Sequence, residues 1–288
     1  DSITIAGGIN KVLGDNGLAT FDATGQLLEL LSQNLSDGSD DTIRTGGGND
    51  IVIAGTGSDD VATTGGHNRI LGDSGRLIFD ASGILRSMTS IDDASGASDT
   101  INSATGDDLI IGGEGSDVVA ATGGHNIIVG DFGNIIFDVL GILTQVFTRD
   151  VAGFGADAVT TGPGNDIILG GAGTDNINAA DGNNVVAGDF AQIDMYDSRL
   201  SKFVSLDAGS GHGDVIQVGN GNDTVIANDG ADQVTASGGN NLLIGDHAML
   251  MYHANGELQK VESTSPTAGD IDTILSGFGQ DLVIAGHD

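Results

Sequence analysis

The chain has 288 residues, of which 9 are Lys or Arg and 41 are Asp or Glu, so its formal net charge is −32. This charge excludes nucleic acid as an expected partner, and the absence of Cys excludes disulfide bonds. Because 39% of the residues are apolar and the aliphatic ones recur at fixed positions, we expect a packed core, with the negative charge balanced by ions that the sequence does not contain.

One segment recurs five times along the chain, at intervals of 58, 58, 58 and 57 residues. In chain order the copies are GGINKVLGDNG from Gly7, GGHNRILGDSG from Gly65, GGHNIIVGDFG from Gly123, DGNNVVAGDFA from Asp181 and GGNNLLIGDHA from Gly238. A fixed period of this kind indicates a solenoid of stacked units. The predicted boundaries are a partial repeat at 1–34, units at 35–92, 93–150, 151–207 and 208–265, and a partial repeat at 266–288, all in one continuous solenoid. Because both ends fall inside a repeat, we expect the chain to be a window from a longer array.

A second period of nine residues runs inside each unit and places Asp three times and then Asn at the same point of the repeat. These positions are Asp41, Asp50, Asp59 and Asn68; Asp99, Asp108, Asp117 and Asn126; Asp157, Asp166, Asp175 and Asn184; Asp214, Asp223, Asp232 and Asn241; and Asp272 and Asp281. Two residues after each comes an aliphatic residue, such as Ile43 after Asp41, and these residues are the predicted core.

The last ~22 residues of each unit do not follow the nonapeptide period. They read RLIFDASGILRSM from Arg76, IIFDVLGILTQVF from Ile135 and LMYHANGELQKV from Leu250, a strand, a short turn and a strand. This pattern favours a β-hairpin, and a wider third coil of the solenoid is the alternative. The copy MYDSRLSKFV from Met195 lacks the turn Gly, so its turn is expected to differ. The apolar residues of the insert either widen the core or form a lateral strip for self-association, for example Ile142, Leu143, Val146 and Phe147.

The nonapeptides fit the pattern G-G-x-G-x-D-x-U-x, best from Gly47 to Ile53 and on through Asp59. In this the chain resembles the repeats-in-toxin, or haemolysin-type, calcium-binding family. The resemblance implies an all-β fold, a parallel β-roll or β-solenoid in which two nonapeptides make one 18-residue coil, with the hairpin or third coil inserted once per unit.

In such a coil Asp41 lies over Asp59, and Asp50 lies over Asn68. Coils ~4.8 Å apart would bring carboxylates close enough to repel strongly, and a divalent cation between them would remove the repulsion. Oxygen is the ligand type offered in number, which favours Ca²⁺. Charge balance suggests roughly two to three Ca²⁺ per unit. By resemblance the remaining ligands are carbonyl oxygens of glycines such as Gly46, Gly48, Gly55 and Gly57. The alternative, that these aspartates only cap turns, leaves the charge of −32 without compensation.

The Asn of the fourth nonapeptide should weaken its ion site, because it carries one charge fewer than Asp. A Gly-Asp pair follows it in every copy, with Asp15, Asp73, Asp131, Asp189 and Asp246. These aspartates either restore the missing charge or start the turn into the insert.

The sequence is compatible with two functions and argues against a third. The first is a calcium-stiffened structural segment, an extender, filament or adhesin-like rod of a large secreted or cell-surface protein, which we expect to come from a Gram-negative bacterium. The second is a calcium-triggered folding and type I secretion module of a toxin or secreted enzyme. An enzyme is not expected, because His67 and His125 are replaced by Asn or Ile in other copies and no nucleophile motif appears. No apolar stretch approaches the ~20 residues of a membrane-spanning helix.

Overall fold

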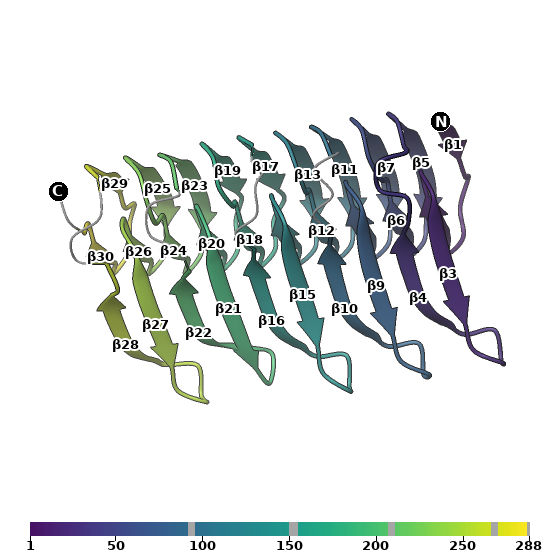
Figure 1. The fold of residues 1–288 in the computed structure, drawn as a ribbon. Helices are drawn as coiled ribbons and strands as arrows, with labels where there is room; N and C mark the ends of the chain where they lie inside the picture. Colours follow the sequence, from purple (N-terminus) through teal and green to yellow (C-terminus); the bar gives the residue numbers. More distant parts are fainter. Residues whose placement is uncertain (92–95, 150–154, 207–210, 266–269, 287–288) are drawn as a thin grey trace.

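Strands of three to seven residues alternate with short turns throughout the computed structural model, which describes residues 1–91, 96–149, 155–206, 211–265 and 270–286. The strands form three ten-stranded sheets that run the length of the molecule, and we name them sheets A, B and C. Figure 1 shows them as three layers, and in each unit the chain passes through sheets A and B twice and then enters sheet C once, as a hairpin.

Sheets A and B are parallel and hold the nonapeptide strands. Sheet A contains β1 (Ser2–Thr4), β5 (Thr42–Gly47), β7 (Asp60–Gly65), β11 (Thr100–Thr105), β13 (Val118–Gly123), β17 (Ala158–Thr161), β19 (Asn176–Ala179), β23 (Val215–Asn220), β25 (Gln233–Gly238) and β29 (Thr273–Leu275). Sheet B contains β2 (Lys11–Leu13), β6 (Ile51–Ile53), β8 (Arg69–Leu71), β12 (Leu109–Ile111), β14 (Ile127–Val129), β18 (Ile167–Leu169), β20 (Val185–Ala187), β24 (Thr224–Ile226), β26 (Leu242–Ile244) and β30 (Leu282–Ile284).

Sheet C is antiparallel and holds the inserts. Its strands are β3 (Gly17–Phe21), β4 (Leu27–Ser32), β9 (Gly75–Phe79), β10 (Leu85–Ser90), β15 (Gly133–Phe137), β16 (Leu143–Thr148), β21 (Ala191–Tyr196), β22 (Arg199–Ser205), β27 (Ala248–Tyr252) and β28 (Leu258–Ser263). Each insert is therefore a hairpin, as the favoured interpretation predicted, and neighbouring hairpins also pair with one another, as β10 does with β15. The predicted all-β parallel solenoid with one hairpin per unit is confirmed.

The hairpin turns follow the sequence differences between the copies. In the second copy the Asp80 carboxylate accepts hydrogen bonds from the amides of Ser82 and Ile84, and Gly83 adopts a φ of 80°. In the fourth copy the turn shortens to Asp197 and Ser198, with φ values of 49° and 59°, the left-handed geometry of a two-residue hairpin turn. The turn of that copy differs, as predicted.

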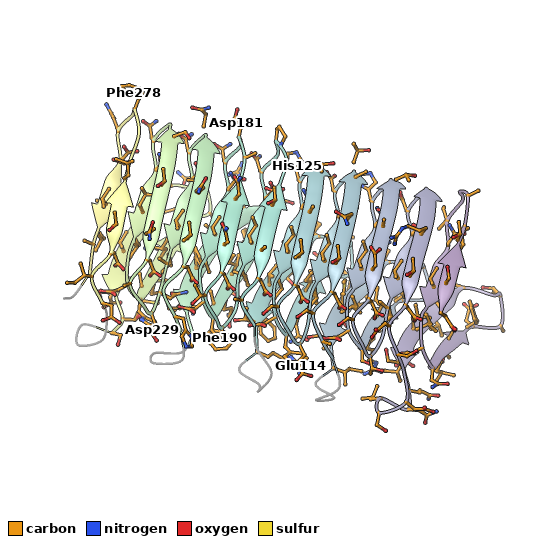
Figure 2. All side chains as sticks on the ribbon, turned by 90° about the horizontal axis from the view of Figure 1, so that it is seen from above. Glu114, His125, Asp181, Phe190, Asp229 and Phe278 are labelled. Carbon is orange, nitrogen blue, oxygen red and sulfur yellow. The ribbon has the colours of Figure 1, made fainter. Side chains whose placement is uncertain are left out.

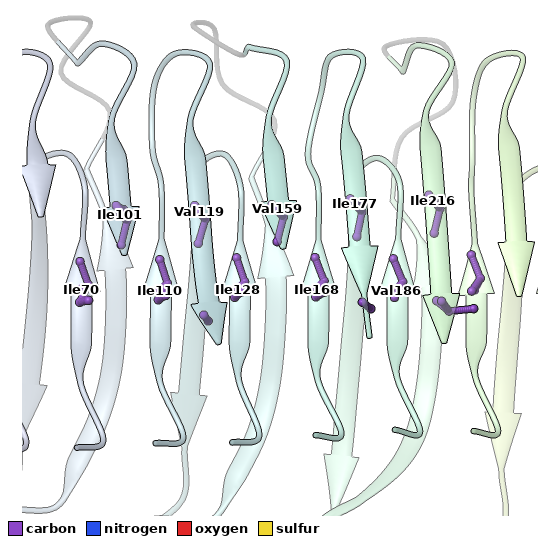
Figure 3. Packing of buried hydrophobic residues seen from close by; sticks show 14 of the residues in the cluster. Ile70, Ile101, Ile110, Val119, Ile128, Val159, Ile168, Ile177, Val186 and Ile216 are labelled. Atoms are coloured by element: carbon purple, nitrogen blue, oxygen red, sulfur yellow. The ribbon is translucent and has the colours of Figure 1, made fainter. Parts of the chain in front are cut away.

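The predicted aliphatic positions form the core between sheets A and B. Ile101, Val119 and Val159 from sheet A face Ile110, Ile128 and Ile168 from sheet B, all fully buried (Figure 3). Val283, in the last coil, is 42% exposed, because that coil packs against a neighbour on one side only. Each unit adds two strands to every sheet and so advances the stack by about 10 Å, the value expected when the insert is a hairpin.

A second core lies between sheets B and C and includes Ile53, Leu77, Met88 and Ile135. Val146 is fully buried in this core, and Leu143 packs against it. Val146 is therefore part of the packed interior and is not available to a lateral strip. Self-association through the outer face of sheet C stays a prediction.

The two faces of β16 offer a matched test of this layer. Val146→Ser should lower the free energy of unfolding by about 2–4 kcal/mol, because it replaces a buried aliphatic side chain with a polar one. The partly exposed neighbour Phe147 lies on the opposite face, so Phe147→Ser should cost about 1 kcal/mol or less. Denaturant unfolding at a fixed excess of calcium measures both, and equal losses would show that sheet C does not pack as described.

Candidate calcium-binding edges

The repeated Asp and Asn residues line the two edges of the stack formed by sheets A and B. We call the edge at which the chain leaves sheet B and enters sheet A, directly or by way of a hairpin of sheet C, the aspartate edge, and the edge at which it passes from sheet A to sheet B the mixed edge. Figure 2 shows Glu114, Phe190 and Asp229 along the aspartate edge, and His125 and Asp181 along the mixed edge. The side chains of both rows are buried, and the edges differ in composition and hydrogen bonding.

The aspartate edge carries a carboxylate in every coil. Its row contains Asp41, Asp59, Asp99, Asp117, Asp157, Asp175, Asp214, Asp232 and Asp272. The backbone amide of each Asp donates to Oδ1 of the next, at 2.6 Å from Asp41 to Asp59 and at 2.7 Å from Asp59 to Asp99. The stacking of Asp41 over Asp59 is as predicted, and the row continues across the insert, where consecutive members lie 39 or 40 residues apart.

The mixed edge alternates carboxylate and amide side chains. Its row contains Asp50, Asn68, Asp108, Asn126, Asp166, Asn184, Asp223, Asn241 and Asp281. The Nδ2 group of Asn68 donates to Oδ1 of Asp108 at 3.0 Å, and that of Asn126 donates to Oδ1 of Asp166 at 3.0 Å. The Asn of the fourth nonapeptide therefore partners Oδ1 of the Asp of the next unit directly, while Oδ2 of Asp50, Asp166 and Asp223 is buried without a hydrogen-bond partner.

Burial on the aspartate edge removes the carboxylates from water without supplying a donor for every oxygen. Side chains such as Asp99, Asp117 and Asp175 are 1% exposed, and Oδ2 of each is buried with no hydrogen-bond partner. Burial raises the pKa of Asp59 to about 7 and that of Asp99 to about 8. A buried carboxylate oxygen without a donor is costly, so these oxygens require a cation or a proton.

Glycine leaves space at the points where these free oxygens lie. A Cβ on Gly112 would sit 2.2 Å from Oδ2 of Asp117 and 2.2 Å from the carbonyl oxygen of Gly130. Gly14 shows the same arrangement, with Oδ2 of Asp41 at 2.1 Å and the carbonyl oxygen of Ala54 at 2.2 Å. A carboxylate and a carbonyl from neighbouring coils thus converge on space that any side chain would fill.

This donor set fits Ca²⁺, which binds carboxylate and carbonyl oxygens at 2.3–2.6 Å in flexible geometries. Among the described residues, no three His, Asp or Glu side chains are arranged to hold an ion by themselves, so backbone carbonyls must complete any site. When bound, the ion would supply the positive charge that the buried row lacks. The chain contributes the rigid spacing of its coils and the glycines that keep the space open.

The structure places the four predicted glycine ligands in both edges. Gly46 lies in the last turn-facing part of β5 and Gly48 in the turn after it, both toward the mixed edge, and Gly55 and Gly57 lie on the aspartate edge. The carbonyl that converges with Asp41 belongs to Ala54, one residue before Gly55, and the sequence reasoning missed it because it followed glycine alone. The ligand roles of the four glycines stay predictions.

The Gly-Asp pair lies on the aspartate edge, opposite the Asn that precedes it. Asp15 accepts hydrogen bonds from the amides of Ser39 and Thr56, and Asp131 accepts one from the amide of Ala172. These aspartates therefore do not restore the charge missing at the Asn positions. They add a third carboxylate per unit to the aspartate edge.

Comparison with known proteins adds one finding. The family model of the RTX calcium-binding nonapeptide repeat matches the chain four times, at residues 36–70, 93–128, 151–186 and 208–243, together roughly half of its length. The comparison found no similar curated protein and no similar solved structure. No helix of the described residues is long and apolar enough to cross a membrane.

Proposed function

Because the chain belongs to the RTX calcium-binding nonapeptide repeat family, we propose that it is an extracellular rod segment, an extender or adhesin-like spacer, that folds and stiffens when calcium binds. The family is a structural calcium-binding repeat rather than a catalytic domain. RTX repeats are typical of secreted proteins, which supports a location outside the cell, where calcium is plentiful.

The observation that carries the proposal is the unbroken row of buried carboxylates on the aspartate edge. A unit of 58 residues cannot bury its two cores alone, since every strand pairs with strands of adjoining coils. The coils can stack only when a cation or protons neutralise the carboxylates between them. Calcium binding is thereby coupled to the assembly of the whole stack, which gives a stiff rod in its presence and a flexible chain in its absence.

Small-angle X-ray scattering tests this coupling. With a chelator the radius of gyration should approach the value of an unfolded chain of this length, about 60 Å, and with millimolar calcium it should fall to about 20 Å. A radius that stays near 20 Å after the calcium has been removed would contradict the proposal. A matched measurement with NaCl of equal ionic strength controls for simple screening of the charge.

A second role, a calcium-triggered folding module for type I secretion, is favoured by the same buried carboxylates. A chain that cannot fold at the low calcium concentration of the cytosol stays unfolded for export and folds outside. Folding that is already complete at submicromolar calcium would exclude this second role and leave the rod intact.

A further inference from the structure

The outer face of sheet C points away from sheet B, and no other sheet of the described residues covers it (Figure 1). The register of the sheet brings two side chains from each strand to this face, in two rows that run along the stack. Leu31, Arg76 and Thr89 are neighbours in one row, and Glu29, Ile78 and Ser87 are neighbours in the other. All residues of both rows are at least partly exposed, so the rows form a continuous, accessible surface.

Charge on this face is balanced, although the chain as a whole carries a net charge of −32. The charged residues of the two rows are three acids and three bases: Glu29, Asp194 and Glu262, and Arg76, Lys202 and Lys260. The acids have partners within the face, since Nε of Arg76 donates to Oε1 of Glu29 at 2.6 Å and Nε2 of Gln145 donates to Oδ1 of Asp194 at 2.7 Å. A second copy that approaches this face therefore meets no excess of like charge.

Apolar side chains occupy both rows between these charges. They include Leu31, Ile78, Ile136, Phe147, Val204 and Met249, none of which is buried. Near β4, β9 and β10 the face is hollowed by a space of about 670 Å³, whose lining includes Leu31, Ile78 and Ile91. Partly exposed apolar side chains that follow one another along a whole face favour contact with another protein surface.

The regular spacing of the face favours one kind of partner. The hairpins follow one another at about 10 Å, the width of two strands, and the two rows repeat with them. A partner that contacts all five hairpins in register must repeat its side chains at the same interval, and a second copy of this chain does so. The face is about 43 Å long and about 14 Å wide, so two copies would bury about 1,200 Å² in total, the lower end of the range for specific interfaces.

We propose that two copies of the chain pack side by side through the outer faces of their C sheets. The inference goes beyond the single rod of the proposed function, because it gives that rod a lateral partner. Each further unit of an array would add two strands to the contact, so long arrays would pair more tightly than short ones. Pairing requires the folded stack, but the contact itself lies away from both calcium-binding edges.

Sedimentation equilibrium of the full chain in millimolar calcium tests the pairing. The weight-average mass should rise from 28.8 kDa towards twice that value as the protein concentration increases. Ile136→Glu combined with Phe147→Glu places two charges in the middle of the face and should weaken the pairing by about tenfold or more. The matched control, Val139→Glu with Leu140→Glu, adds the same charges at the tip of the third hairpin, where these side chains are 69% and 73% exposed, and should leave the pairing unchanged.

Circular dichroism in calcium verifies that each variant is folded. Phe147→Ser removes an apolar contact without adding a charge, and it provides a second variant if the double one does not fold. It should weaken the pairing by about threefold or more.

A wild-type chain that stays monomeric up to about 1 mM would overturn the proposal, because specific interfaces of this size bind more tightly than that. Equal weakening by the face variant and the tip control, or unchanged pairing of a folded face variant, would overturn it as well. A monomeric wild type that instead sediments with phosphatidylcholine vesicles would assign the face to a lipid surface and would also overturn it. None of these results changes the calcium dependence of folding, so they are distinct from a failure of the proposed function.

Discussion

Removal of calcium at neutral pH is expected to abolish most of the strand signal of the chain in far-ultraviolet circular dichroism. In the ion-free stack Asp99, Asp117 and Asp157 would lie buried in one row with unsatisfied oxygens. Their mutual repulsion at low effective dielectric, together with the cost of burial, exceeds the few kcal/mol by which folded domains are usually stable. The three-residue strands of sheet B cannot compensate, since isolated short strands are marginal.

The measurement compares chelator-treated protein with the same sample after calcium is added back. Calcium should restore the signal, while Mg²⁺ at equal concentration should restore little, because it requires compact octahedral geometry and holds its water tightly. A strand signal that persists after the metal is shown to have left would contradict the claim that the aspartate edge needs calcium to fold.

Protonation of the buried carboxylates at lower pH is expected to stabilise the fold in part when calcium is absent. Burial raises the pKa of Asp59, Asp157 and Asp232 to about 7 and that of Asp99 to about 8 in the folded, ion-free chain, from 3.8. The pKa of Asp189 rises to about 9 by burial, with further contributions from neighbouring carboxylates. The folded state thus binds protons more tightly than the unfolded chain.

Because folding takes up protons, the free energy of unfolding of the ion-free chain should fall as the pH rises from about 4 through about 8. Chelator-treated protein that is unfolded at pH 8 should therefore regain strand structure near pH 5, still above the sequence pI of about 4.1. Circular dichroism across this range checks the sign, with calcium-saturated protein at pH 8 as the folded reference. Gain of strand as the pH rises would contradict the burial of these carboxylates.

The sequence predicts the solenoid and its first core because both depend on local periodicity. The nine-residue register places Ile101 and Ile110 inward without any knowledge of long-range pairing, and both are fully buried. The second core was predicted only in part. A run of consecutive apolar residues indicates a strand that is buried on both faces. Sheet B shows such runs at Ile51–Ile53 and Leu242–Ile244, whereas in sheet A the apolar residue of Thr42–Arg44 has polar neighbours.

The edge to which the Gly-Asp pair belongs could not be predicted from the period. Asp131 follows Asn126 by five residues, but strand β14 lies between them, so the two side chains lie on opposite edges of the stack. The turn that packs against Asp131 depends on whether the insert is a hairpin or a coil. The insert's form in turn depends on the pairing of strands from different units, which the nine-residue period does not reveal. The sequence does not indicate the position of the Ala54 carbonyl oxygen near Asp41, because every residue type has a backbone carbonyl.

The positions of bound ions decide whether the aspartate edge holds calcium. Crystals grown in millimolar calcium and measured at a long X-ray wavelength would reveal calcium by its anomalous scattering. We expect a line of peaks along the aspartate edge, each within about 2.6 Å of a carboxylate oxygen such as Oδ2 of Asp117. An ordered stack of coils with no anomalous peak beside Asp99, Asp117 or Asp175 would contradict this expectation.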